Sequence, residues 1–137
     1  MARTSTHFQY QIEFPSTMKG HHISARFYRA STADYMECLP DTSDAAQAKD
    51  IDAIGILSKN EQIVGHIPKN LTSLLSHFLR HGTITCNPTG ERFYRHGLEV
   101  PCRYILKGEH YNHIKMLKNE LNKIKIENVT EISKLKI

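Results

Sequence analysis

Apolar and polar residues alternate along several short stretches of the chain, which is the pattern of half-buried β-strands. Residues 7–14 alternate in this way, and residues 23–28 and 35–39 continue the pattern. Pro15 opens a segment up to residue 20 that predicts a turn, and the small, polar segment 40–50 predicts a loop. The first third of the chain therefore predicts three strands and no helix.

The segment 51–82 is the most informative, because it predicts a β-hairpin followed at once by a helix. Apolar strands at 53–57 and 63–67 are separated by five residues that are mostly polar. Gly65 and His66 interrupt the second strand. A glycine inside a strand marks a bulge or a close approach of two backbones, and the histidine beside it is a candidate binding residue.

A helix is predicted directly after this hairpin, and two further strands follow the helix. Pro68 suits the first turn of a helix, and Gly82 is a candidate residue just beyond its end. Between them, apolar residues recur at helical spacing: Leu71, Leu74, Leu75, Phe78 and Leu79. Strands are predicted at 83–86 and 98–106, joined by a basic, aromatic loop.

The composition changes at Gly108, where a lysine-rich helix with an apolar seam is predicted. The seam has the spacing of a short heptad pattern: Ile114, Leu117, Leu121 and Ile124. It either packs against the rest of the chain, which is the commoner case, or pairs with a second helix in a homodimer. Residues 130–137 either continue this helix or fray. Seven short strands and two helices together predict a mostly β fold, a small barrel over residues 1–108 with a C-terminal helical extension over 109–137.

Composition and charge restrict the functional class only weakly. A net charge of +4 is compatible with a polyanionic partner, and no apolar run reaches the ~18 residues of a membrane span. The N-terminal residues lack the apolar core of a secretory signal. The cysteines, Cys38, Cys86 and Cys102, have no CxxC spacing and are interpreted as reduced. We expect an intracellular protein, nuclear if its source is eukaryotic.

Two segments mix arginine with aromatic residues in the way that single-stranded nucleic acid requires. Arg26, Phe27 and Tyr28 lie on one predicted strand, and Phe93 and Tyr94 lie in the basic loop. Arginine neutralises phosphate, and an aromatic ring stacks on an unpaired base for about 1–3 kcal/mol. The alternative is that the phenylalanines belong to the core and the arginines only solvate strand faces.

Metal binding and catalysis have weaker support. His77 and His81 are four residues apart on the predicted helix, but no HExxH pattern is present, so the pair is interpreted as surface histidines. Cys86 and Cys102 lie among apolar neighbours, where a free cysteine behaves as a small hydrophobic residue. We expect no metal, no cofactor and no enzymatic activity. The remaining enzymatic reading is a hydrolase that uses His66 and Asp50.

Three segments, taken in order, resemble the HIRAN domain, a module of fork-remodelling helicases. They are Lys19–Tyr28 (KGHHISARFY), Asp50–Ile54 (DIDAI) and Gln62–Ile67 (QIVGHI), and the resemblance covers about residues 18–108. It implies an OB-like, SH3-like six-stranded barrel with two helices that binds the free 3′ end of single-stranded DNA. It also implies a role at replication forks and in DNA repair, beside a helicase or nuclease partner.

The resemblance assigns a role to individual residues. Arg26 would contact phosphate and Phe27 would stack on a base, while Asp50 would accept a hydrogen bond from the 3′-hydroxyl. His66 would contact the terminal phosphate or sugar. Lys49 stands where the family has a stacking tyrosine. The loss of one stacked base is worth roughly a tenfold to hundredfold weakening.

The family also has an aromatic residue near its last strand, at a position that corresponds to about Leu98 here, and Phe93 or Tyr94 could substitute for it. The alternative function is a protein-interaction domain that keeps the barrel, has lost the DNA-end pocket and dimerises through its terminal helix.

Overall fold

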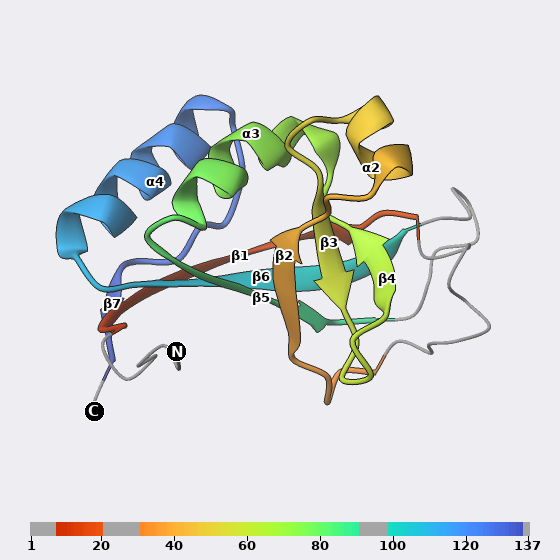
Figure 1. Cartoon of the computed structure of the whole chain (residues 1–137). Helices are drawn as coiled ribbons and strands as arrows, with labels where there is room; N and C mark the ends of the chain where they lie inside the picture. The colour runs from red at the N-terminus through yellow and green to blue at the C-terminus, as the bar shows by residue number, and fades with distance from the viewer. Residues whose placement is uncertain (1–7, 21–30, 91–98, 136–137) are drawn as a thin grey trace.

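The computed structural model describes residues 8–20, 31–90 and 99–135. Figure 1 shows helices α3 and α4 side by side above the long strands β1, β5 and β6, with α2 above the β3–β4 hairpin. The elements are β1 (Tyr10–Met18), β2 (Met36–Pro40), α2 (Asp44–Lys49), β3 (Ile54–Leu57), β4 (Ile63–His66), α3 (Lys69–Phe78), β5 (Gly82–Pro88), β6 (Val100–Gly108), α4 (Tyr111–Lys123) and β7 (Ser133–Lys134).

All strand pairs of the described sheet are antiparallel, and their order is β4-β3-β2-β5-β6-β1-β7. The chain just after β1 returns to β4, where Lys19 and His66 form a bridge. Each backbone N–H of this pair donates to the carbonyl of the other at 2.8 Å. This bridge closes six strands into a ring, with the short β7 outside it. The predicted mostly β fold, a small OB-like barrel with a C-terminal helix, is therefore confirmed.

Strand β1 continues through Pro15, so the predicted turn at 15–20 is wrong. Pro15 pairs with Arg103 of β6. The backbone N–H and C=O of Glu13 bond to Thr130, on the side away from β6. Because backbone groups repeat their direction every second residue, the nitrogen of Pro15 faces the same side. A proline there costs no ladder hydrogen bond, which explains why the strand tolerates it.

The predicted loop at 40–50 contains helix α2, which the sequence analysis missed. Ser43 is its N-cap, and the Ser43 hydroxyl accepts a hydrogen bond from the N–H of Ala46 at 3.3 Å. Asp44 lies in the first turn and Lys49 in the last, where each charge is favoured by the helix dipole. The local signal was present, since a serine cap before an alanine-containing segment is a helix start.

The hairpin β3–β4 and helix α3 follow the prediction, but Gly82 does not cap the helix. The helix ends at Phe78 with Leu79 as C-cap, and Gly82 is the first residue of β5. A Cβ at Gly82 would lie 2.1 Å from the carbonyl oxygen of Lys107 and 2.7 Å from the Phe78 ring. The glycine is therefore required by the close packing of β5, β6 and α3.

The seam of α4 packs within the chain. Ile114, Leu117 and Leu121 are buried in the same hydrophobic cluster as the strands, whereas Ile124 is largely exposed. These three buried residues are therefore not available to a second helix. The helix ends at Lys123, and the following segment returns to the sheet, where β7 pairs with the start of β1. The prediction that residues 130–137 continue the helix or fray is wrong for residues 130–135.

The core lies between the barrel strands and the two long helices. Its largest fully buried side chain is Tyr104, whose hydroxyl donates to the carbonyl of Thr17 at 2.7 Å. Cys38, Cys86 and Cys102 are free thiols within this core. Among the described residues, no helix is long and apolar enough to cross a membrane. The predicted strand at 23–28 lies outside the described residues.

Candidate nucleic-acid interface

Of the eight residues predicted for the interface, the structure describes three. Asp50, His66 and Lys49 lie around the corner where β4 leads into α3. The other five, Arg26, Phe27, Tyr28, Phe93 and Tyr94, lie outside the described residues. We call the described group formed by Asp41, Asp50, His66, Lys69 and Thr72 the β4–α3 corner.

His66 ends β4 and is held by its backbone and its side chain. Its backbone forms the bridge to Lys19 that closes the barrel. Its imidazole Nε2 lies 2.6 Å from Oδ2 of Asp41, and its side chain is 37% exposed. Nε2 is therefore occupied, and Nδ1, on the side of Gly20, is the ring nitrogen that remains for a further hydrogen bond.

Asp41 is a buried carboxylate that the sequence analysis did not identify. Burial by itself raises the pKa of Asp41, but hydrogen bonds from His66 and Ser43 outweigh it and lower the pKa below its usual value. The carboxylate is therefore ionised at neutral pH and fixes the orientation of the imidazole. A hydrolase that pairs His66 with Asp50 is not the arrangement found, since the carboxylate beside His66 is Asp41.

Asp50 follows α2 and contacts the first turn of α3. Its Oδ2 accepts a hydrogen bond from the Thr72 hydroxyl at 2.6 Å, and its Oδ1 accepts one from the N–H of Asp52 at 3.0 Å. The hydrogen bond from Thr72 is the main reason that the pKa of Asp50 is lowered, with Lys69 contributing. An ionised carboxylate only accepts hydrogen bonds and has room for about four. Asp50 can therefore accept one from a ligand hydroxyl.

The N-terminus of α3 adds positive potential to this corner. Pro68 is the N-cap and forms no side-chain capping bond, and the exposed Lys69 is the first helical residue. Backbone N–H groups and the helix dipole favour an anion at such a position. Lys49 is exposed in the last turn of α2, directly before Asp50. The corner therefore combines two ionised carboxylates, the buried Asp41 and the more accessible Asp50, with the exposed ammonium group of Lys69, and the exposed Lys49 lies directly before Asp50.

Gly65 explains how β1 comes so close to β4. A Cβ at Gly65 would lie 2.3 Å from Cγ and 2.6 Å from Sδ of the buried Met18. Only a glycine at this position leaves room for the Met18 side chain. The close approach of the two strands in turn allows the bridge between Lys19 and His66. Lys19 also forms an ion pair with Glu99. The prediction that Gly65 marks a close backbone approach is confirmed.

Three residues of the corner were missed by sequence reasoning: Asp41, Lys69 and Thr72. Asp41 carried a local signal, because an aspartate two residues before a helix-capping serine typically accepts a bond from that serine's N–H. Lys69 directly follows Pro68, which the sequence already marked as the start of a helix. A lysine at a predicted helix N-terminus could have been proposed as an anion-binding residue. Thr72 carried no signal, since its contact with Asp50 depends on how α3 packs.

Comparisons with known proteins match this fold to one kind of domain. The crystal structure of the HIRAN domain of human HLTF superposes with a TM-score of 0.61 and 16% identity, over 85% of this chain and 93% of that chain. An NMR structure of the HLTF HIRAN domain in its DNA-bound conformation superposes with a TM-score of 0.61 and 16% identity, over 88% of this chain and 93% of that chain. The chain has a HIRAN-like fold.

A second NMR structure of the HLTF HIRAN domain gives a TM-score of 0.55 at 15% identity, over 85% of this chain and 91% of that chain. The chain matches no protein-family model and no curated protein sequence. At this identity the likeness is one of fold. The HIRAN-like fold agrees with the resemblance that the short motifs around Asp50 and His66 carried.

Proposed function

We propose that this chain is a non-catalytic nucleic-acid-binding module that takes the 3′-hydroxyl end of single-stranded DNA at the β4–α3 corner. The observation that carries the proposal is the pairing of an ionised Asp50 with an adjacent helix N-terminus in a fold shared with a DNA-bound HIRAN domain. In this proposal Asp50 accepts a hydrogen bond from the terminal hydroxyl, and Lys69 and His66 contact the nearest phosphate.

The charges of the corner support a strand end rather than a continuous strand. A carboxylate accepts a hydrogen bond from a free hydroxyl and repels a phosphate in the same place. Lys69 and the α3 terminus attract a phosphate one position away. Because Nε2 of His66 bonds to Asp41, Nδ1 is the ring nitrogen that contacts the ligand in this proposal. In this proposal Arg26 and the aromatic residues Phe27, Tyr28, Phe93 and Tyr94 supply further phosphate contacts and base stacking.

The buried cysteines argue against nucleophilic chemistry by the described residues. The hydrogen bond with Cys102 and burial both raise the pKa of the Cys86 thiol, and burial raises the pKa of Cys38. A thiol with a raised pKa carries almost no thiolate at neutral pH and is inert. The module would therefore act by binding, and a helicase or nuclease partner would supply catalysis.

The test is fluorescence anisotropy at physiological salt, with a short single strand that ends in a 3′-hydroxyl, the same strand with a 3′-phosphate, and a blunt duplex. We expect the 3′-hydroxyl strand to bind most tightly. Asp50→Asn should weaken its binding roughly tenfold to a hundredfold, because hydrogen bonds to charged groups are worth about 1.5–3 kcal/mol.

Asp44→Asn is the matched control, because Asp44 is exposed in the first turn of α2 and the change in net charge is the same. It should leave the preference for the hydroxyl end intact. Equal, salt-sensitive binding of all three probes by the wild type would refute end recognition. An unchanged preference in Asp50→Asn would remove Asp50 from the site.

A further inference from the structure

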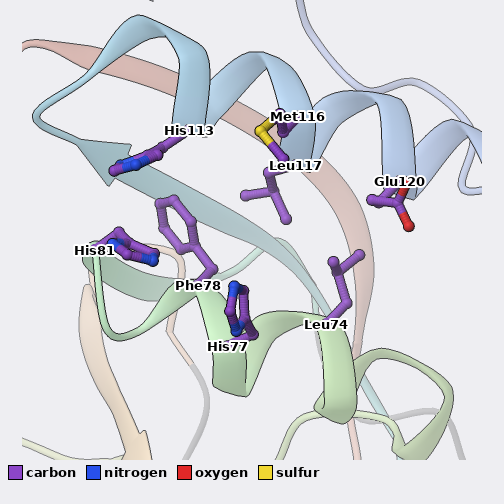
Figure 2. Close-up of a pocket in the computed structure, with 8 residues that line it drawn as sticks. All are labelled: Leu74, His77, Phe78, His81, His113, Met116, Leu117 and Glu120. Atoms are coloured by element: carbon purple, nitrogen blue, oxygen red, sulfur yellow. The ribbon is translucent and has the colours of Figure 1, made fainter.

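Helix α3 carries one polar side chain on a buried face that is otherwise apolar. Its buried residues are Leu71, Thr72, Leu75 and Phe78. Toward the end of the helix this face meets α4, and Figure 2 shows Leu74, Phe78 and Leu117 around a pocket of about 280 Å³ whose walls are mainly apolar carbon. Near the start of the helix, Thr72 is only 3% exposed. A buried hydroxyl is costly unless it is hydrogen-bonded, so a threonine at this position depends on the bonds that it makes.

The Thr72 hydroxyl has two acceptors, and the closer one is Asp50. Its Oγ1 lies 2.6 Å from Oδ2 of Asp50 and 2.9 Å from the carbonyl oxygen of Lys69. A hydroxyl has one proton, and a hydrogen bond from a hydroxyl to a carboxylate is about 2.5–2.7 Å long, so the proton lies mainly toward Asp50. The contact with the Lys69 carbonyl selects one of the χ1 rotamers open to a threonine in a helix. The donor therefore has a fixed direction.

This donor links Asp50 to α3. The other described contacts of Asp50 are with its own segment. Its Oδ1 accepts from the N–H of Asp52 at 3.0 Å, its backbone N–H donates to the carbonyl of Ala46 at 2.9 Å, and its carbonyl accepts from the N–H of Ala53 at 3.0 Å. Among these contacts, only the one with Thr72 reaches the helix, so it sets where the carboxylate lies relative to the N-terminus of α3.

We propose that Thr72 is a positioning residue for strand-end recognition, whose hydroxyl holds the Asp50 carboxylate beside the N-terminus of α3 so that a 3′-hydroxyl binds better than a 3′-phosphate. This inference rests on the proposed function. The nucleotide fixes the distance between its terminal hydroxyl and the nearest phosphate, so the acceptor for the hydroxyl and the cation for the phosphate must keep a matching separation. Lys69 and Thr72 belong to the first turn of α3. One helical turn therefore carries the cation and also the residue that fixes the acceptor.

The same hydrogen bond supports the charge that the site requires. It is the main reason that the pKa of Asp50 is lowered, and the N–H of Asp52 and the ammonium group of Lys69 act in the same direction. An ionised carboxylate accepts a hydrogen bond from a terminal hydroxyl and repels a terminal phosphate. Thr72 therefore contributes to both the place and the charge of the acceptor without contacting the strand itself.

The experiment compares binding of the 3′-hydroxyl and 3′-phosphate strands by the full chain and its Thr72 variants. Thr72→Val keeps the shape of the side chain but removes the hydroxyl. It should weaken binding of the 3′-hydroxyl strand roughly twofold to tenfold, the size of one intramolecular hydrogen bond, and leave binding of the 3′-phosphate strand unchanged. Thr72→Ala, which also lacks the hydroxyl and suits a helix, should give the same result. Thr72→Ser keeps the hydroxyl and should keep the wild-type preference.

Ser76→Ala is the matched control, because Ser76 is a half-buried hydroxyl residue one turn further along α3. It should leave the preference unchanged. In an Asp50→Asn background, Thr72→Val should cause less than about a twofold further loss, because Thr72 acts through Asp50. NMR titration of the Asp50 carboxyl in DNA-free protein should give a higher pKa in Thr72→Val than in the wild type or Thr72→Ser. Urea denaturation checks that each variant is folded.

The outcomes separate this inference from the proposed function. If the wild type shows no preference for the 3′-hydroxyl strand, the proposed function fails and the inference fails with it. If Asp50→Asn removes the preference while Thr72→Val and Thr72→Ala keep it, the proposed function stands and the inference is overturned. An equal loss of binding to both strands in the two variants would also overturn it, because Thr72 would then only stabilise the fold.

Discussion

Replacing Gly65 by alanine tests whether the barrel depends on the close approach of β1 and β4. The added Cβ would lie 2.3 Å from Cγ of Met18, well inside the 3.5–4.0 Å of a normal carbon contact. Met18 is fully buried and has no solvent to move into. The same Cβ would lie 3.0 Å from the carbonyl oxygen of Lys19, which accepts a hydrogen bond from the N–H of His66. The methyl group therefore strains the bridge that closes the barrel.

The expected loss follows from two opposing terms. Overpacking of a dense core costs about 1–3 kcal/mol, and this site belongs to the upper part of that range because both neighbours are constrained. Alanine restricts the unfolded chain more than glycine does, which by itself stabilises the folded protein by about 0.4–1 kcal/mol. Gly65→Ala should therefore lower the free energy of unfolding by roughly 1–2.5 kcal/mol. Urea denaturation followed by far-UV circular dichroism measures it, since the chain has no tryptophan.

Gly55→Ala is the control, because the three atoms nearest its Cβ all belong to the side chain of Ile63, the closest at 3.1 Å, and Ile63 is 39% exposed and can shift. We expect it to change stability by less than about 1 kcal/mol. Equal stability of the two variants, or a Gly65→Ala protein as stable as the wild type, would refute the close-approach argument. Adding Met18→Ala to Gly65→Ala should cost less than the two single losses combined, because the methyl group then fills vacated space.

Three further predictions concern single side chains. Lys49→Tyr should tighten binding of the 3′-hydroxyl strand roughly tenfold or more in the anisotropy assay, because it adds one stacking ring. Asp41→Asn should lose about 1–3 kcal/mol of stability at pH 7. Because folding lowers the pKa of Asp41, its contribution is present above the unfolded value of about 3.9 and disappears as pH falls through the lower folded value, so the urea curves of variant and wild type should converge as the pH is lowered through that range. Because folding lowers the pKa of His81, the wild type should lose stability as pH falls below about 6.5, and His81→Gln should flatten that loss in melting curves recorded with chelator.

Much of the barrel could be predicted from periodicity, because its strands and helices carry their own local patterns. The hairpin, α3 and the apolar face of α4 follow directly from the spacing of apolar residues. The continuation of β1 through Pro15 could not be predicted, since it depends on which strand edge Thr130 covers. Helix α2 was missed because its six residues bury no side chain and show no apolar period.

The candidate site was predicted in part. Asp50 and His66 were identified by their motifs, and Gly65 by its place inside a strand. The contacts of Asp41 with His66 and of Thr72 with Asp50 are recognisable only in three dimensions, because each pair is more than 20 residues apart in the chain. The contact between His81 and His113 could not be predicted from the sequence either, since the two rings meet only when α4 packs against α3.

The pairing of the first strand has a consequence for synthesis of the protein on the ribosome. Strand β1 pairs along its whole length with β6, from Tyr10 with Gly108 to Met18 with Val100, and its other described partners are the short β7 and, just beyond its end, His66. At about 5–20 residues per second, β6 emerges roughly 5–20 seconds after β1. Throughout that interval the apolar face of β1, with Ile12 and Phe14, lacks the strand that later pairs along its length. The nascent chain therefore exposes this apolar face until residue 108 has left the exit tunnel, which makes it prone to aggregation during synthesis.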